Sequence, residues 1–383
     1  MKNTTATSES TISYHHGVLT IRRRWRIPAI LLMAVILTAA LWTALIRLGW
    51  SLPAVAGASA IEHGALMVSG FLGTLIALER AVALKRRWAY VAPAASALGT
   101  ILILATLPPV LGRSLIVVAA VGLVAIFIFI YRRHPSADTA AMSIGAVLWL
   151  AGNLLWWASQ PIAHAVPWWA GFLVLTIAGE RLELARVLRL TPLVKRLFAG
   201  SIVVFLAGLG LSLISFDAGV RVAGAGLFLL AAWLIRYDIA RRTIRMNGLT
   251  RYIAACLLPG YFWMAAAGVV WIVDAPYFLG GLYYDAMLHM VFLGFVFSMI
   301  FGHAPIILPS VLGVPVTYRP VFYVHLLMLH LSLAVRVAGD LLLNAAWRQW
   351  GGLFNVIAVL LFIALTAWSA RRSRQPALPA MKV

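Results

Sequence analysis

Residues 63–80 read HGALMVSGFLGTLIALER, and residues 164–181 read HAVPWWAGFLVLTIAGER. A histidine, Gly-Phe-Leu, Ile-Ala and Glu-Arg recur between these two stretches at one constant offset of 101 residues. A looser third copy begins at His289, continues through Gly294-Phe295, and has His303 where the other two copies have glutamate. Apolar stretches of about 20 residues cross a bilayer as helices. The recurrence therefore predicts membrane-spanning helices built on a repeated unit.

The composition of the whole chain supports this interpretation. It is 63% hydrophobic and only 11% charged, less than half the charged fraction of a typical soluble domain. Short alternating segments, which are typical of β-barrels, are absent from the sequence. The net charge of +20 does not indicate nucleic-acid binding, because the cytoplasmic loops of membrane proteins collect Lys and Arg. The single cysteine, Cys256, excludes an intramolecular disulfide and a thiolate metal site. The expected partner is the lipid bilayer.

The expected fold is an all-α polytopic membrane helical bundle of about twelve transmembrane helices, arranged as three four-helix units. The transmembrane domain covers residues 27–369, with pseudo-repeats at 27–131, 140–236 and 252–369. A basic tail, 1–26, precedes it, and a second tail, 370–383, follows it. The predicted spans are 27–46, 62–79, 91–110, 114–131, 140–158, 167–185, 198–215, 220–236, 252–273, 283–304, 320–339 and 352–369.

The distribution of charge predicts the orientation of these spans. With the N-terminus inside, only five of the 31 basic residues fall on the outer side. These five are Arg47, Arg113, Arg221, Arg336 and Arg348. Both termini are therefore expected in the cytoplasm, and the protein in a bacterial-type inner (plasma) membrane. The three repeated histidines then lie at the outer ends of spans 2, 6 and 10, one in each unit.

Histidine is costly to bury in a span unless a partner satisfies it, and imidazole is a common ligand of haem iron and of copper. Met67 follows His63 by four residues on the same helical face, where its thioether would suit Cu(I) or the edge of a haem; plain packing is the alternative. Gly70 and Gly294 allow close approach of either a flat macrocycle or a neighbouring helix. Both interpretations stay open at this point.

The outer-end histidines of spans 2, 6 and 10 resemble those of the haem–copper oxidases and nitric oxide reductases. The motif from His63 through Met67 to Gly70-Phe71, with His289 followed by Gly294, is more similar to the NnrS family of twelve-span haem- and copper-containing membrane proteins. The resemblance implies that His63 and His289 ligate a b-type haem and that His164 binds copper. It also implies that Arg336 holds haem propionates, although an ion pair between Arg336 and Asp340 is the alternative.

The sequence also departs from these families. Residues 198–215 contain no histidine where the oxidases have a His-His pair, and His289 is followed by Met290 and Val291, without a second histidine. Residues 302–309, GHAPIILP, lack the extended signature associated with NnrS. A complete oxygen-reducing centre is therefore not expected, and neither is a proton-pumping oxidase.

Three further histidines lie on the last helices. His303 follows His289 by fourteen residues, which places both on one face of a regular helix about 21 Å apart. A second, inner metal site with His325 and His330 is one interpretation, and proton transfer and interhelical hydrogen bonding are the others. For Glu79-Arg80 and Glu180-Arg181, the alternatives are anchoring ion pairs or proton uptake.

The resulting hypothesis is an NnrS-like membrane haem protein, with copper as a second cofactor, in nitric oxide metabolism or protection against nitrosative stress. It implies an electron donor and a small gaseous ligand such as nitric oxide. If the protein is an enzyme, it is a haem-dependent oxidoreductase. The first alternative is a twelve-span secondary transporter without a cofactor, which predicts broken helices and charged residues near mid-membrane. A scaffold for a respiratory complex is the other alternative.

Overall fold

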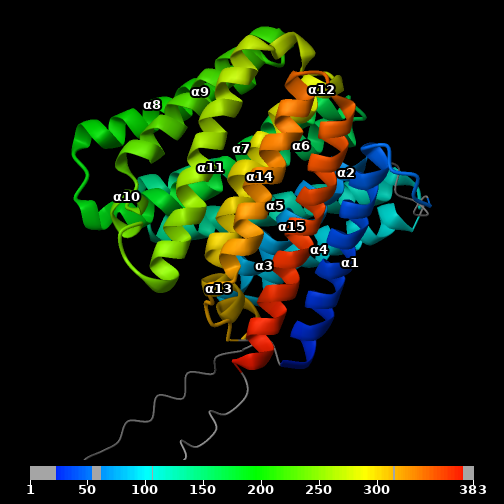
Figure 1. Cartoon of the computed structure of the whole chain (residues 1–383). Helices are drawn as coiled ribbons and strands as arrows, with labels where there is room; N and C mark the ends of the chain where they lie inside the picture. The colour runs from blue at the N-terminus through cyan, green and yellow to red at the C-terminus, as the bar shows by residue number, and fades with distance from the viewer. Residues whose placement is uncertain (1–22, 54–61, 106, 314, 374–383) are drawn as a thin grey trace, which may run out of the picture.

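The computed structural model describes residues 23–53, 62–105, 107–313 and 315–373, and this part of the chain forms helices and no strands. Figure 1 shows the long helices packed side by side. The helices of the first unit are α1 (Arg23–Arg47), α2 (His63–Ala65), the π-helix η2 (Leu66–Leu72), α3 (Gly73–Leu84), η3 (Arg87–Tyr90), α4 (Val91–Leu104) and α5 (Pro109–Arg133). Those of the second unit are α6 (Ala137–Trp157), α7 (Ile162–Leu184), η4 (Ala185–Leu188), α8 (Pro192–Leu211) and α9 (Phe216–Tyr237).

After the short α10 (Ala240–Thr243), the third unit consists of α11 (Gly248–Val273), η5 (Ala275–Tyr277), α12 (Gly281–His289), the π-helix η6 (Met290–Phe297), α13 (Ser298–Leu312), α14 (Phe322–Leu341) and α15 (Ala345–Arg372). In the described residues, eleven helical stretches are long and apolar enough to cross a membrane, and each coincides with a predicted span. The apolar part of α1, Leu31–Arg47, corresponds to the remaining span. The prediction of an all-α polytopic membrane bundle is confirmed.

The predicted boundaries needed correction at some spans. Span 6 begins at Ile162, directly after Pro161, and Pro167 lies inside the helix. Both prolines are suited to a helix start, and the sequence alone gave no reason to choose the earlier one. Span 12 is longer than predicted and covers Ala345–Arg372. Most of each predicted tail, with His15 and His16, lies outside the described residues.

The outer surface of the bundle suits contact with lipid. Large apolar side chains such as Val203, Phe262 and Leu327 are at least 60% exposed. A soluble protein rarely exposes so many large apolar side chains, whereas a membrane helix presents them to the hydrocarbon core. The chain is therefore a multi-pass membrane protein.

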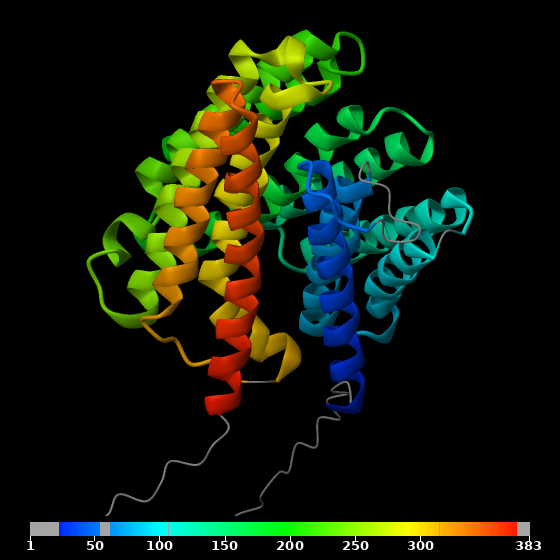
Figure 2. The ribbon, with the colours of Figure 1, turned by 45° about the vertical axis from the view of Figure 1, so that its right-hand side comes forward.

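The three units follow one another around the bundle. Unit one meets unit two where α5 packs on α6, and unit two meets unit three where α9 packs on α11. The first and last spans also touch, with the rings of Trp50 and Trp350 5.3 Å apart. The start of α1 and the end of α15 lie at the same end of the molecule (Figure 2). We call this end the inner end and the opposite one the outer end.

Two π-helices interrupt the repeated second helix of units one and three. The segment η2 follows His63 after three residues, and η6 follows His289 directly. The corresponding helix of unit two, α7, continues without a π-helical turn. The prediction that His289 and His303 lie on one face assumed a regular α-helix between them. Because a π-helix has wider turns than an α-helix, this prediction does not apply.

Candidate functional site

A cavity near the outer end of the bundle gathers side chains from all three units. Its walls come from α1, the α2–η2 segment, α7, the α12–η6 segment, α14 and α15. Most of the lining is apolar, and Trp169 of α7 and Tyr284 of α12 also line it. The apolar lining residues include Leu41, Val68, Leu72, Val166, Leu288, Phe292, Leu293, Phe297, Val356 and Val359. Such a cavity, with a few polar groups among apolar walls, is the usual form of a cofactor or ligand site.

His63 and His289 both line this cavity, and both hold the same hydrogen bond. Nδ1 of His63 lies 2.8 Å from the carbonyl oxygen of Ala40, and Nδ1 of His289 lies 2.7 Å from that of Asp285. A carbonyl oxygen only accepts, so Nδ1 carries the proton in each ring and donates it. Within the described part of the chain, no hydrogen bond is made by Nε2 of either ring. With respect to the described residues, the lone pair on Nε2 of each imidazole is therefore free.

The other residues that were predicted to bind a cofactor divide into two groups. Met67 lines the cavity, as expected from its position relative to His63. Gly70 and Gly294 do not line it. A Cβ at Gly70 would lie 3.0 Å from the side chain of Thr100, and one at Gly294 would lie 2.5 Å from that of Trp263. These two glycines permit helix packing, whereas Gly64 lines the cavity and has open space at its Cβ position.

A buried ion cluster stands next to His289. Arg336 donates from Nε to Oδ2 of Asp285 at 2.8 Å and from NH2 to Oδ1 at 2.9 Å. Asp340 lies 3.3 Å from Nε of Arg348. The alternative of an ion pair between Arg336 and Asp340 is therefore wrong, because Arg336 turns to α12 and Arg348 faces Asp340. Arg336 still lines the cavity, with both arms of its guanidinium fork on one carboxylate.

Arg47 is the second arginine of the cavity. It is exposed at the outer end of α1, and in the described part of the chain it has no carboxylate partner. An exposed guanidinium at the rim of an apolar cavity is suited to hold the carboxylate or phosphate of a ligand whose body lies deeper.

His164, the third repeated histidine, does not line the cavity. Ile162 and Val166 of the same helix do so, whereas the ring of His164 turns away and lies 4.4 Å from that of Phe216. His164 precedes the predicted start of span 6 at residue 167, but it lies in the first turn of α7 and is half-buried. Its Nδ1 is buried and has no hydrogen-bond partner among the residues that the structure describes.

His303, His325 and His330 each lie in a separate hydrogen-bond network. Nε2 of His303 is 3.4 Å from NH1 of Arg181, and Nε2 of His325 is 3.0 Å from the hydroxyl of Tyr252. His330 accepts from Trp263 at Nδ1, 3.1 Å away, and its Nε2 lies 3.2 Å from Oγ of Ser298. Within the described residues, no three side chains of His, Cys, Asp or Glu come together as a metal site. The structure thus favours interhelical bonding for His325 and His330.

Several residues of the site were not singled out from the sequence. Asp285, which pairs with Arg336 and accepts from His289 through its main chain, is one. Another group is a buried polar network behind the cavity: Oδ1 of Asn153 accepts from Nε1 of Trp169 at 3.1 Å and from Oγ of Ser69 at 2.7 Å. The signal for Asn153 was an amide in the middle of an apolar span, which is costly unless it is hydrogen-bonded.

The residues of the cavity fit a haem. Two histidine rings and two arginines from different helices line one apolar cavity, and among the described residues neither histidine makes a hydrogen bond from Nε2. The other predicted metal ligands, His164, His303, His325 and His330, lie away from this cavity.

Comparison with known proteins finds one matching family model, and its description assigns no function. The family model described as "Domain of unknown function (DUF8744)" matches residues 26–371. The match covers all twelve predicted spans. No curated protein matches the chain.

Proposed function

Because the chain belongs to the DUF8744 family, whose description assigns no activity, we propose a function from the geometry of the outer cavity. The protein is a multi-pass membrane haem protein in which His63 and His289 hold one b-type haem between units one and three.

The proposal rests on one observation: His63 and His289 have the same tautomer and the same type of hydrogen bond. Each donates from Nδ1 to a main-chain carbonyl, and this bond fixes the ring orientation and leaves Nε2 as the basic atom. Both Nε2 atoms belong to rings that line the same cavity. A purely structural role at a helix end would not explain why both histidines line one apolar cavity and have no hydrogen bond at Nε2 among the described residues.

The surroundings of the two histidines suit the same group. Phe292, Phe297 and Val356 are among the apolar side chains that would exclude water from the faces of a macrocycle. Arg47 at the rim would hold a carboxylate of the haem edge. Asp285 holds Arg336 with both carboxylate oxygens and fixes His289 through its carbonyl, so the pair positions the ligand on α12.

A haem held by His63 and His289 would supply one-electron chemistry and a site for a small gaseous ligand. The role implied by the resemblance to NnrS proteins, nitric oxide metabolism or protection against nitrosative stress, belongs to this proposal. So do an electron donor, an oxidoreductase activity, and a bacterial-type inner membrane with both termini in the cytoplasm. Copper belongs to the proposal only through the resemblance.

A secondary transporter is the second candidate, and one observation favours it. The second helices of units one and three are interrupted by π-helices at corresponding positions. Interrupted helices at matching places in two repeats are typical of transporter binding sites. Such a protein would need no haem.

The experiment that separates the two candidates is purification in detergent from cells supplied with iron and copper. The haem proposal expects iron and protoporphyrin in near-equal amounts and a sharp α band after reduction. His63→Ala and His289→Ala lose the haem, whereas the control His164→Ala keeps it. Protein that is folded by circular dichroism but free of iron would contradict the haem proposal and leave the transporter. Copper in the wild type would show that the resemblance to NnrS extends to the second metal.

A further inference from the structure

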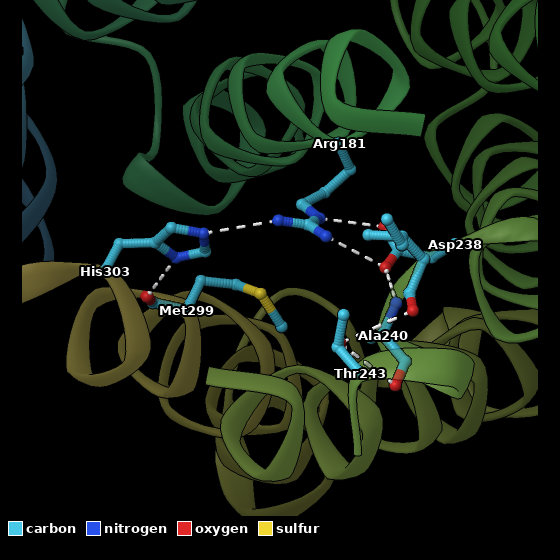
Figure 3. Close-up of polar contacts among 7 residues, drawn as sticks. Arg181, Asp238, Ala240, Thr243, Met299 and His303 are labelled. Carbon is cyan, nitrogen blue, oxygen red and sulfur yellow. Dashed lines mark hydrogen bonds and ion pairs between the residues drawn. The ribbon is translucent and has the colours of Figure 1, made fainter. Parts of the chain in front are cut away.

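The repeated Glu-Arg motif has no part in the outer cavity, yet the structure brings its copies together near the inner end of the bundle. Arg80 of unit one donates to Glu180 of unit two. Arg181 of unit two points to His303 of unit three, which stands at the glutamate position of the repeat (Figure 3). The arginine of one unit thus reaches the acidic position of the next.

A third contact of this kind, from an arginine of unit three to Glu79 of unit one, is missing among the described residues. The residue that follows His303 is Ala304, where the other two copies have arginine. Unit three therefore has no arginine at this position of the repeat to pair with Glu79. In the part of the chain that the structure describes, the cation paired with Glu79 is Arg80 on the same helix, with Nη2 3.8 Å from Oε1. Arg80 also donates to Glu180.

Arg181 compensates little of the charge of Glu79, because its guanidinium is paired with Asp238. Nε of Arg181 donates to Oδ2 of Asp238 at 2.8 Å, and NH2 donates to Oδ1 at 2.9 Å (Figure 3). Both partners are almost fully buried, with 3% and 0% of their side chains exposed. The two arginines of this cluster therefore face three carboxylates, Glu79, Glu180 and Asp238. Among the described residues, one of these negative charges has no matching cation.

His303 does not supply that cation in the geometry observed. Its Nδ1 lies 2.7 Å from the carbonyl oxygen of Met299 and donates to it, and its Nε2 faces an N–H of Arg181 (Figure 3). Since a guanidinium only donates, Nε2 must accept, and the ring is neutral. A protonated His303 would point a second N–H at Arg181.

We propose that Glu79, flanked by Arg80, Glu180 and His303, binds one proton at the inner end of the bundle. A proton is the cation that suits this place, because an imidazole neighbour is a poor ligand for the alkali and alkaline-earth cations, which prefer oxygen. The side chains of Glu79 and Glu180 are 23% and 28% exposed, so water can deliver and remove the proton.

The groups around Glu79 can be named element by element. Arg80 lies on its own helix, Glu180 on α7 and His303 on α13. Helix α4 carries no charged residue, and α5 presents the ring of Phe127 to Arg80 at 5.7 Å. Glu183, exposed on α7, adds negative charge near Arg80, and Tyr261 of α11 lies beside Arg181 and Asp238. None of these groups adds a second cation next to Glu79.

The test is infrared spectroscopy of the purified full-length protein in nanodiscs, with the glutamate carboxyl groups labelled with ¹³C. Between about pH 5 and pH 8, the wild type is expected to show the labelled C=O band of one protonated glutamic acid that titrates. Glu79→Gln removes this band, and the matched control Glu183→Gln keeps it. The label separates the band from buried aspartic acids.

A second variant keeps the test decisive if Glu79→Gln does not fold. Glu180→Gln frees Arg80 to pair with Glu79 alone, so Glu79 should stay ionised and the band should disappear there too. Absence of any labelled acid band in the wild type over this range would overturn the proposal, because the cluster would then be a fixed belt of ion pairs. Retention of the band in Glu79→Gln would overturn it as well. Neither outcome depends on the presence of haem.

Discussion

Asp285 and Arg336 form a two-point ion pair between α12 and α14, with donor–acceptor distances of 2.8 and 2.9 Å, next to the ring of His289. Both side chains are nearly buried, at 5% and 7% exposure. The carbonyl of Asp285 also fixes Nδ1 of His289. One aspartate therefore joins the ion cluster to the histidine that is proposed to bind iron.

Asp285→Asn would leave Arg336 buried with an incomplete partner. Removal of one member of a buried pair typically costs about 3–5 kcal/mol, so the midpoint of thermal unfolding in detergent should fall clearly. The matched control is Asp217→Asn, which breaks the exposed pair with Arg221 on α9 and should change stability by less than about 1 kcal/mol. Equal midpoints for the two variants would show that the buried pair does not hold α12 to α14.

The contact between α8 and α9 depends on glycine. A Cβ at Gly208 would lie 2.2 Å from the main-chain nitrogen of Ala223, which cannot move without shifting α9. Gly208→Ala is therefore expected to destabilise the bundle by about 1–3 kcal/mol. Gly210→Ala, on the same helix but with nothing within 4 Å of the added carbon, should be neutral or slightly stabilising. Thermal unfolding of the two variants in one detergent makes the comparison, and similar losses in both would contradict the close packing.

Arg47 is expected to retain the proposed haem without ligating it. Arg47→Gln removes an exposed cation from the rim of the cavity, where solvent screens its charge, so the haem should be lost roughly two- to fivefold faster. The visible spectrum should keep its shape, because both histidines stay in place. Transfer of haem to excess apomyoglobin measures the rate, and Arg221→Gln, at the same end of the bundle, is the control. A rate equal to that of the control would remove Arg47 from the site.

The membrane-spanning helices of this chain were predictable from sequence, since hydropathy decides what can cross a bilayer. The constant offset between the first two histidine stretches indicated the repeat, and α2–α3 and α7 confirm their equivalent places in the first two units. His63, Met67 and His289 were predicted to share a site, and all three line one cavity.

The rest depended on packing that the sequence does not encode locally. Hydropathy cannot distinguish π-helix from α-helix, so η2 and η6 were not foreseen. The glycine pattern was visible, but only the neighbours Thr100 and Trp263 show that Gly70 and Gly294 face helices. Arg336 was visible too, yet its partner is 51 residues away in the chain and not one turn away. Pairings between distant helices are set by the tertiary fold.

The most direct test of the central claim is electron paramagnetic resonance of the oxidised, purified protein. If His63 and His289 hold one haem between them, the wild type gives the signal of low-spin ferric haem with two imidazole ligands. His289→Ala then converts any haem that remains to a high-spin signal, which added imidazole returns to low spin, and His164→Ala leaves the wild-type signal unchanged. A wild-type signal that is high-spin, or a low-spin signal that survives in both His63→Ala and His289→Ala, would contradict the account.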